Sequence, residues 1–296
     1  MTAPGIVSRA GALLELVRAP AALTVLGDAL AGAASAGRPA DAGRTVRLAA
    51  ASSCLYWAGM ALNDYADRRE DAEERPGRPL PSGRIGPRTA LVTAVALTGA
   101  GLASAAAAGG RDTLAVAVPL AATVWAYDLA LKHTRYGPVA MASARGLDVL
   151  MGAGARRSGR ALVPAALLAA HTCAITRVSR AETRGAGASL PAGALAVTGA
   201  VGLLGAALTP RTATRAERAA STALLGGYAL AAGSAQLAAT VRPDATRLRR
   251  AVGAGIHAMI PLQAALTARG GSPRAAFSLL AAYPLARSLS RKVSPT

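Results

Sequence analysis

The chain has 296 residues, of which 52% are apolar and 3% aromatic, and its formal net charge is +18. Apolar runs of about twenty residues recur from one end to the other, separated by short arginine-rich connections. Such runs cross the roughly 30 Å hydrocarbon core of a bilayer as helices, and most lack a polar stripe at the helical period. The pattern excludes a soluble fold. Arginine-rich loops facing anionic lipid explain the charge, so no nucleic-acid partner is expected.

The apolar runs predict an all-α, polytopic membrane helix bundle in a single domain over residues 1–296. Ala and Gly are frequent in them, which indicates closely packed helices. The least apolar run, 247–268, carries Arg249, Arg250 and Gln263, so we expect it to lie at the interface or to enter the membrane partway. In chain order the ten runs are 17–36, 44–62, 89–108, 112–131, 137–155, 161–178, 190–208, 219–240, 247–268 and 273–290.

The basic residues predict the orientation of the bundle. With ten spans, 20 of the 33 Lys and Arg residues fall on the side of the N-terminus and 12 on the other side, while Arg145 lies within a span. Loops rich in Lys and Arg stay in the cytoplasm. We therefore expect the loop 63–88 to be cytoplasmic. The frequent Ala, Gly and Arg residues suggest a bacterial cell membrane.

The loop after the second run is acidic, although the chain as a whole is basic. Six of the 15 acidic residues lie within residues 64–74. On a helix continuing from the second run, Asp64, Asp67 and Asp71 share one face, where their charges repel one another unless a cation lies between them. Carboxylate oxygens at a site open to water suit Mg²⁺. A solvated acidic helix end is the alternative reading.

Basic side chains follow the acidic residues in the same loop. Arg75 and Arg78 come next, and then Arg84 and Arg88. Carboxylates that hold a metal, beside guanidinium groups that bond phosphate oxygens in pairs, are the combination that binds a diphosphate. This order of residues favours a functional site over a solvated helix end.

Some charged residues lie inside predicted spans. A charge at that depth is costly, so it is functional or paired. Arg145 has Asp148 three residues further on as its expected partner. Asp28, in the first span, is expected to line a cavity or to pair with an arginine.

Two consecutive stretches carry a family resemblance. "NDYADRRED" followed by "RPGRPLPSG" resembles the UbiA superfamily of intramembrane prenyltransferases, where N-D-x-x-D-x-x-x-D precedes R-P-x-R-P-L-P-S-G. "VRAPAALTVLGDALAG" is similar to the first helix of the family, and "YDLALKHTRYGPVAMASARGLDVLMGAG" to its fourth and fifth. The resemblance implies about nine transmembrane helices around a cavity open to lipid. Cytoplasmic loops, here 63–88 and 176–189, would cap it. Because ten apolar runs exceed nine helices by one, the run 247–268 is then the one that we do not count as a transmembrane helix.

The resemblance also implies roles for individual residues. Asn63, Asp64, Asp67 and Asp71 would hold Mg²⁺ and, through it, an isoprenyl diphosphate. Asp64 and Asp67 are expected to be catalytic. Arg145 is expected to be catalytic on independent grounds, as a charge within a span. The diphosphate itself would contact Asn63, Arg75, Arg78, Lys132, Ser179 and Arg180.

The second acidic motif of the family is altered. The family carries D-x-x-D-x-x-x-D at the end of its sixth helix, where this chain reads "AITRVSRAETRGAG" with Thr176 and Ser179 in place of carboxylates. Glu182 is the one acid left, as a weaker metal ligand, and Arg180 can bind phosphate directly. This "SRxE" pattern resembles an EboC-like branch of the superfamily.

The implied activity is Mg²⁺-dependent transfer of a prenyl group to a hydrophobic, electron-rich and often aromatic acceptor within the bilayer. A terpene cyclase of the same fold, which uses no acceptor, is the first alternative. A non-catalytic transporter or lipid-binding protein is the second, but it has no need of the arginines in the loop.

Overall fold

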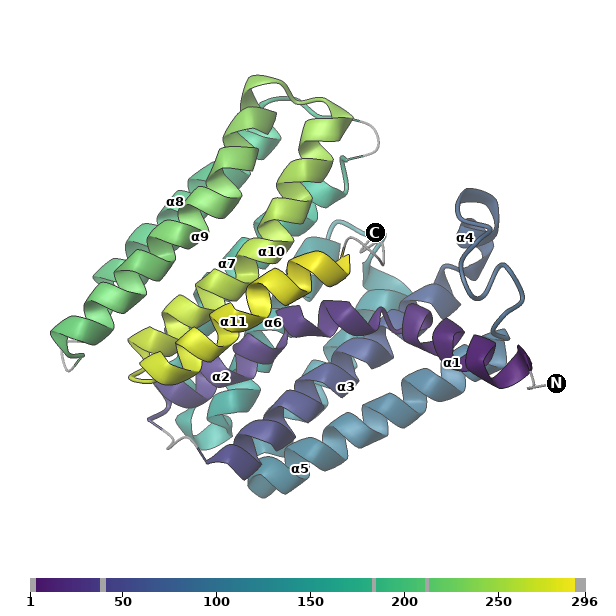
Figure 1. Ribbon diagram of the computed structural model, residues 1–296, viewed down its shortest axis with the longest axis horizontal. Coiled ribbons are helices and arrows are strands. Elements are labelled where there is room, and N and C mark those ends of the chain that lie inside the picture. The colour runs from purple at the N-terminus through teal and green to yellow at the C-terminus, as the bar shows by residue number, and fades with distance from the viewer. Residues whose placement is uncertain (1–3, 38–40, 183–184, 211–212, 291–296) are drawn as a thin grey trace.

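The computed structural model describes residues 4–37, 41–182, 185–210 and 213–290 (Figure 1), and all regular elements in those residues are helical, which confirms the all-α prediction. Residues 183–184 of the predicted capping loop 176–189 lie outside the described residues. The helices are α1 (Pro4–Leu16), α2 (Leu26–Ser35), α3 (Ala42–Ala66), α4 (Arg68–Glu74), α5 (Pro87–Ala126), α6 (Gly137–Ala153), α7 (Ser158–Ser179), α8 (Ser189–Ala207), α9 (Arg215–Val241), α10 (Ala245–Arg269) and α11 (Pro273–Ser290), with the 3-10 helices η1 (Ala19–Thr24) and η3 (Ala155–Arg157) and the π-helix η2 (Tyr127–Leu131).

The long element α5 is two antiparallel helices joined by a glycine turn. Gly110 has φ +60° and ψ −143°, a conformation that glycine adopts and other residues avoid. Beyond the turn the chain runs back on itself, because Trp125 Nε1 donates a hydrogen bond to Thr98 Oγ1 at 3.1 Å. In one straight helix these residues would be about 40 Å apart. The predicted pair of runs, 89–108 and 112–131, is therefore confirmed as a hairpin.

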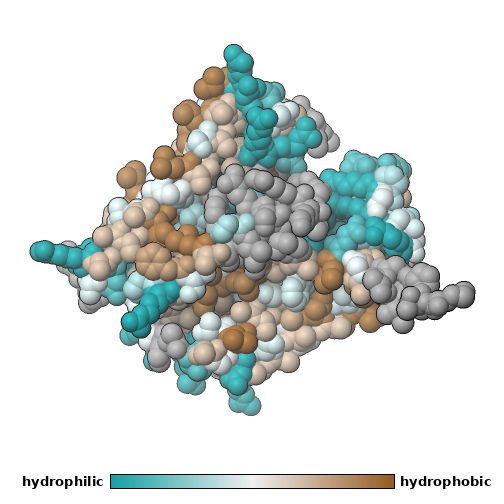
Figure 2. Space-filling view, viewed as in Figure 1, coloured by the Kyte–Doolittle hydropathy of each residue, from teal (hydrophilic) through white to brown (hydrophobic). Residues whose placement is uncertain are grey.

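The connections between helices collect at the two ends of the bundle. At one end Arg44 donates to the carbonyl oxygen of Gly152 at 2.8 Å, and Arg157 to that of Ala36 at 3.1 Å. Arginines at these positions bind the free carbonyls that close helices α6 and α2. At the other end Lys132 pairs with Asp67. Figure 2 shows hydrophilic residues over α4 and at the ends of the long helices, with more apolar surface between them.

Helices α2 and α6 cross in backbone contact because both carry glycine at the crossing. A Cβ atom on Gly32 would overlap the carbonyl oxygen of Val149, and one on Gly152 would overlap that of Ala29. Small residues of this kind let helices approach where lipid supplies no hydrophobic drive. The crossing supports the inner wall of the bundle, since α6 also packs along α5 and α7.

Helix α10 lies at the centre of the bundle, so the expectation that 247–268 stays outside is wrong. It packs against α2, α7, α9 and α11. Its most apolar window is 78% buried, compared with 22–50% for the other candidate spans. Of the polar residues that weakened its hydropathy, Gln263 is fully buried and donates to Asp28 Oδ1 at 2.6 Å, whereas Arg249 and Arg250 are exposed near the start of the helix.

By length and composition, five helical segments of the described residues suffice to cross a membrane, and Ala245–Arg269 is one of them. The others are Pro87–Leu131, Ala155–Ser179, Ser189–Ala207 and Arg215–Val241. The total of nine transmembrane helices stays a prediction.

The α2–α6 crossing predicts the effect of a single methyl group. Gly152→Ala should destabilise the protein by roughly 1–3 kcal/mol, because the new Cβ meets backbone atoms that cannot move independently. Thermal unfolding in detergent, followed by tryptophan fluorescence, measures the change. Gly99→Ala is the matched control, since Gly99 is exposed in α5 and a methyl group there would meet no atom of a neighbouring element within 4 Å. An unchanged melting temperature for Gly152→Ala would contradict the tight crossing.

Candidate active site

The site begins where α3 ends. Asp67, with φ −86° and ψ 5°, separates α3 from α4, although its N–H still bonds to the carbonyl oxygen of Asn63 at 2.9 Å. The expected continuous helix is thus interrupted at its second aspartate. Asp67 pairs with a different cation from Asp64 and Asp71, but the charges of Asp67 and Asp71 both act on Asp64, so the prediction that the three carboxylates share one site stays a prediction.

Asp64 and Asp71 form one ion cluster with two arginines. Arg78 Nη1 lies 2.7 Å from Asp71 Oδ2 and 3.6 Å from Asp64 Oδ1. Arg18 Nη2 donates to Asp64 Oδ1 at 3.1 Å. Both carboxylates are buried, so their charges depend on these partners. Arg75 lies at the rim, half exposed, with Nη1 3.8 Å from Asp71 Oδ1.

Arg18 was missed in the sequence because its partner is 46 residues away. It is the one non-glycine residue of the described chain with positive φ, at 47°, between α1 and η1. A left-handed backbone costs free energy for such a residue, and strain of this kind gathers at functional sites. Here it directs the guanidinium group onto Asp64.

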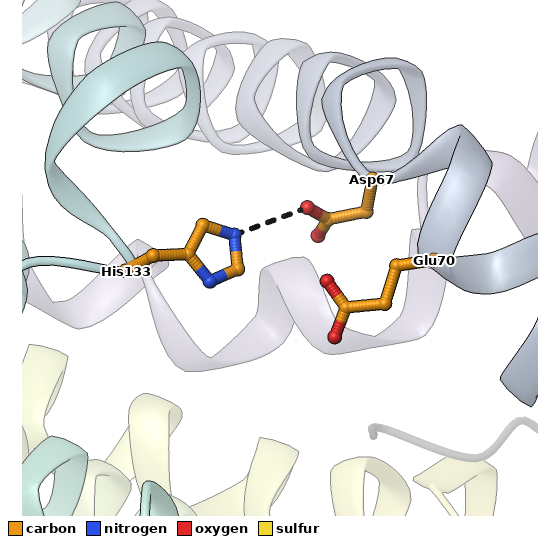
Figure 3. Close-up of side chains that lie close together, drawn as sticks. All are labelled: Asp67, Glu70 and His133. Atoms are coloured by element: carbon orange, nitrogen blue, oxygen red, sulfur yellow. Dashed lines mark ion pairs between the residues drawn. The ribbon is translucent and has the colours of Figure 1, made fainter.

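Asp67 lies in a second cluster, with side chains from the turn after η2 (Figure 3). Lys132 Nζ is 2.5 Å from Asp67 Oδ1, and His133 Nε2 is 3.5 Å from the same oxygen. Ligand atoms of Asp67, Glu70 and His133 all lie within 4.8 Å of one another. The structure thus brings Lys132 to the acidic loop, as the resemblance implied, and it adds an exposed histidine there.

A cavity of about 330 Å³ opens beneath these clusters, between η1 and helices α3, α5, α6, α7 and α10. Asn63 lies at its polar end and donates to Asp128 Oδ1 at 3.2 Å. Asp128, in η2, is 4% exposed and also lines the cavity. It stands one helical turn before Lys132 in the sequence, a local signal that could have identified it. The middle of the cavity is apolar, with Leu55, Met60, Leu120, Val124, Ile175 and Ile256.

The end of α7 supplies the other wall. Thr176 and Ser179 line the cavity, but Ser179 Oγ donates to the carbonyl oxygen of Thr176 at 2.9 Å. Arg180 is exposed and donates to the carbonyl oxygen of Thr134 at 2.7 Å. It therefore holds the turn that carries Lys132. Its predicted contact with diphosphate stays a prediction.

Glu182 carries an unpaired oxygen. Its Oε2 is buried and accepts no hydrogen bond within the described structure. Burial raises the pKa of Glu182, while the positive charges of Arg249 and Arg75 act in the opposite direction. Arg75 is therefore close to Glu182 as well as to Asp71, which links the two capping loops electrostatically.

Arg145 lines the cavity at greater depth, but its expected pairing with Asp148 is wrong. Arg145 Nη1 lies 2.5 Å from Asp28 Oδ2 and donates to the carbonyl oxygen of Thr24 at 2.9 Å. Asp28 is fully buried and is paired with an arginine, which confirms one of the two expectations for it. Asp148 instead accepts a hydrogen bond from Ser52. The predicted catalytic role of Arg145 stays a prediction.

The residues at the mouth of the cavity fit Mg²⁺. Carboxylate oxygens of Asp64, Asp67 and Asp71 are the hard ligands that this ion prefers. In the second loop, Oε2 of Glu182 is buried without a hydrogen-bond donor. Such an oxygen is costly unless a ligand satisfies it, and a cation would do so. The three aspartates already bind cationic side chains, so the site accepts positive charge.

A family model described as the UbiA prenyltransferase family matches residues 24–293. The chain belongs to the UbiA prenyltransferase family. The resemblance inferred from the two motifs is thereby confirmed, and the protein is an integral membrane protein. Its EboC-like branch is not tested by this match and stays a prediction.

Curated relatives of this UbiA family member include several named digeranylgeranylglyceryl phosphate synthase. The one from Methanopyrus kandleri is 38% identical over 129 residues, which cover 42% of this chain and 45% of that protein. The one from Ignicoccus hospitalis is 41% identical over 125 residues, covering 42% of this chain and 40% of that protein. The chain thus matches less than half the length of these relatives.

Solved structures of UbiA homologues share the fold. A homologue from Aeropyrum pernix K1 superimposes with a TM-score of 0.67 at 20% identity, over 82% of this chain and 96% of that one. A homologue from Archaeoglobus fulgidus, bound to DMAPP and Mg²⁺, has a TM-score of 0.62 at 16% identity, over 84% and 98% of the two chains. The arrangement of helices around the cavity is therefore that of the UbiA family.

The acidic clusters predict a ligand-dependent gain in stability. Mg²⁺ with inorganic pyrophosphate should raise the melting temperature of the protein, because ligands that bind the folded state stabilise it. Asp64→Asn and Asp67→Asn should each abolish most of this shift. Glu74→Gln is the control, as an exposed acid of the same loop. Equal shifts in all three variants would remove the two aspartates from the site.

Proposed function

We propose that this UbiA family member transfers a prenyl group from an isoprenyl diphosphate to a hydrophobic acceptor inside the membrane, with Mg²⁺ as its cofactor. The observation that carries the proposal is the arrangement of charges: two clusters of carboxylates and cations lie beside the polar end of a largely apolar cavity within the helix bundle. Arg18, which lines the cavity, bonds to Asp64, and Asp128, which also lines it, is acted on by the charges of Lys132 and Asp67. A diphosphate requires the charges, and an isoprenyl chain requires the cavity.

The carboxylates Asp64, Asp67 and Asp71 would hold the metal, with Asn63 and Glu182 beside them. Bound there, Mg²⁺ would supply a Lewis acid that offsets the negative charge developing on a diphosphate. Lys132 and Arg78, which are paired with Asp67 and Asp71, are buried or partly buried cations at this site that would contact the leaving diphosphate. Fixed positive charges there stabilise the departing group as its bond to the allylic carbon breaks.

The cavity determines where the allylic cation is captured. Its apolar wall keeps out water, which would otherwise quench the cation. Tyr56 and Tyr127 also line the cavity, and aromatic rings stabilise cations. The acceptor is expected to be electron-rich, so that a carbon or oxygen atom forms the new bond and then loses a proton.

Names of related proteins agree with this chemistry. The curated relatives are named as synthases of a prenylated glyceryl phosphate, and UbiA homologues of the same fold were solved with DMAPP or GPP and Mg²⁺. These facts concern the related proteins. They support the choice of an allylic diphosphate as donor.

A terpene cyclase is the second candidate function. Thr176 and Ser179 take positions where two carboxylates are expected, so the second metal site of a transferase is weakened here. A cyclase would ionise the same diphosphate and capture the cation with an alkene of the same chain. Incubation with geranyl, farnesyl and geranylgeranyl diphosphates, with and without aromatic acceptors, separates the candidates. Acceptor-dependent adducts support transfer, whereas cyclic hydrocarbons without acceptor support cyclisation.

Loss of either central aspartate should abolish the reaction. Asp64→Ala and Asp67→Ala are each expected to lower Mg²⁺-dependent diphosphate release by at least about 100-fold, because groups that stabilise a transition-state charge contribute that much. Glu182→Gln should lower diphosphate release less, because the second loop contributes one carboxylate whereas the first loop contributes three. Release of diphosphate is measured with a coupled phosphate assay. Full activity in both alanine variants would refute the mechanism, and Glu74→Gln serves as the unaffected control.

We also propose that the acidic loop faces the cytoplasm of a bacterial cell membrane. The excess of Lys and Arg in the connections on that side supports this orientation. In a background with Cys54→Ser and Cys173→Ser, Glu74→Cys should react with a membrane-impermeant maleimide only after the cells are opened. Arg160→Cys, in the first turn of α7 at the opposite end, should react in intact cells. The reverse pattern would overturn the orientation.

A further inference from the structure

A polar pair lies deep in the cavity, away from both ion clusters. Ser52 Oγ, on α3, donates to Asp148 Oδ1, on α6, at 2.6 Å. Both side chains are almost fully buried, with residue exposures of 2% and 5%, and both line the cavity. The mechanism described above uses neither of them.

The neighbouring arginine does not neutralise this carboxyl group through an ion pair. Arg145 Nη1 is bound to Asp28 and to the carbonyl oxygen of Thr24, and Gln263 donates to Asp28 as well. Asp148 thus has one hydroxyl partner in the described structure, on Oδ1. A carboxyl group at membrane depth with one neutral partner is costly to keep, and such groups mark substrate sites.

The pair is too deep to touch the diphosphate. Ser52 precedes Asp64 by twelve residues on α3, which is about 18 Å along the helix axis. A metal ion with its diphosphate spans only part of that distance. Whatever contacts Asp148 is therefore the distal part of a molecule in the cavity. A hydrogen-bond donor on that molecule would satisfy the remaining lone pairs of the carboxyl group and of the Ser52 hydroxyl oxygen.

We propose that Ser52 and Asp148 form a subsite that binds a hydroxyl group on the acceptor. The subsite rests on the proposed function, since it assumes that the cavity receives an acceptor. It selects hydroxylated, largely apolar acceptors over their methyl ethers and hydrocarbon analogues, because these leave Asp148 without a second donor. A site built to bond a hydroxyl group rejects analogues that lack it.

The test uses 2-naphthol and 2-methoxynaphthalene, which differ by one hydroxyl hydrogen and its methyl replacement. Their dissociation constants are measured by calorimetry on the whole chain in lipid nanodiscs, without any prenyl donor. We expect 2-naphthol to bind the unaltered protein about tenfold more tightly, as a hydrogen bond to a carboxylate provides. Asp148→Asn and Ser52→Ala should each reduce this preference toward equal binding.

Ser53→Ala is the matched control. Ser53 is the adjacent buried serine of α3, with 8% exposure, and it is not among the residues that line the cavity. Its removal should leave the preference intact. Melting temperatures and gel filtration verify folding, and Ser52→Ala decides the question if Asp148→Asn does not fold.

Three results would overturn the subsite. The first is equal affinity of the two probes for the unaltered protein. The second is an unchanged preference in both variants, even with lower melting temperatures, which would make the pair structural. The third is acceptor-free formation of cyclic hydrocarbons whose composition changes in Asp148→Asn, which would assign the carboxyl group to a migrating cation. Diphosphate release by the unaltered protein is measured in parallel, so that failure of the proposed function is recognised separately.

Discussion

The pairing of buried carboxylates with cations is the constraint on which this structure depends. Asp64 and Asp71 are buried at the end of the helix bundle, where an unpaired negative charge costs several kcal/mol. Arg78 meets both of them, and Arg18 meets Asp64 from another part of the chain. The loop after α3 and the start of the first span are thereby tied together. A diphosphate site needs these same charges, so folding and binding use one set of residues.

A second set of polar contacts works at membrane depth. Arg145 on α6 and Gln263 on α10 both donate hydrogen bonds to Asp28 on α2, although Gln263 lies 235 positions from Asp28 in the sequence. Each of these hydrogen bonds gives a buried polar side chain a partner that lipid could not supply. The contacts fix three helices around the cavity and explain why α10, the least apolar span, is the most buried one.

The sequence predicted the acidic end of the site better than the interior. The motif around Asp64 and the turn that carries Lys132 depend on local spacing, and the structure brings them together. Arg18 was missed because its partner Asp64 lies 46 residues away, whereas Asp128 was missed although it stands one helical turn before Lys132. The partner of Arg145 was assigned wrongly for a related reason: Asp148 is close in sequence, whereas Asp28 is 117 positions away.

Apolar run length, glycine positions and the charged motifs thus determined by themselves that the chain is a membrane helix bundle with an acidic loop of the UbiA type. These features act within one helix or one loop, so their physical effect can be read locally. Only the tertiary structure decided which buried charges pair, which helix lies at the centre and that Ser52 meets Asp148 inside the cavity. Those outcomes depend on how helices cross, and a crossing is set by all the residues that pack against it at once.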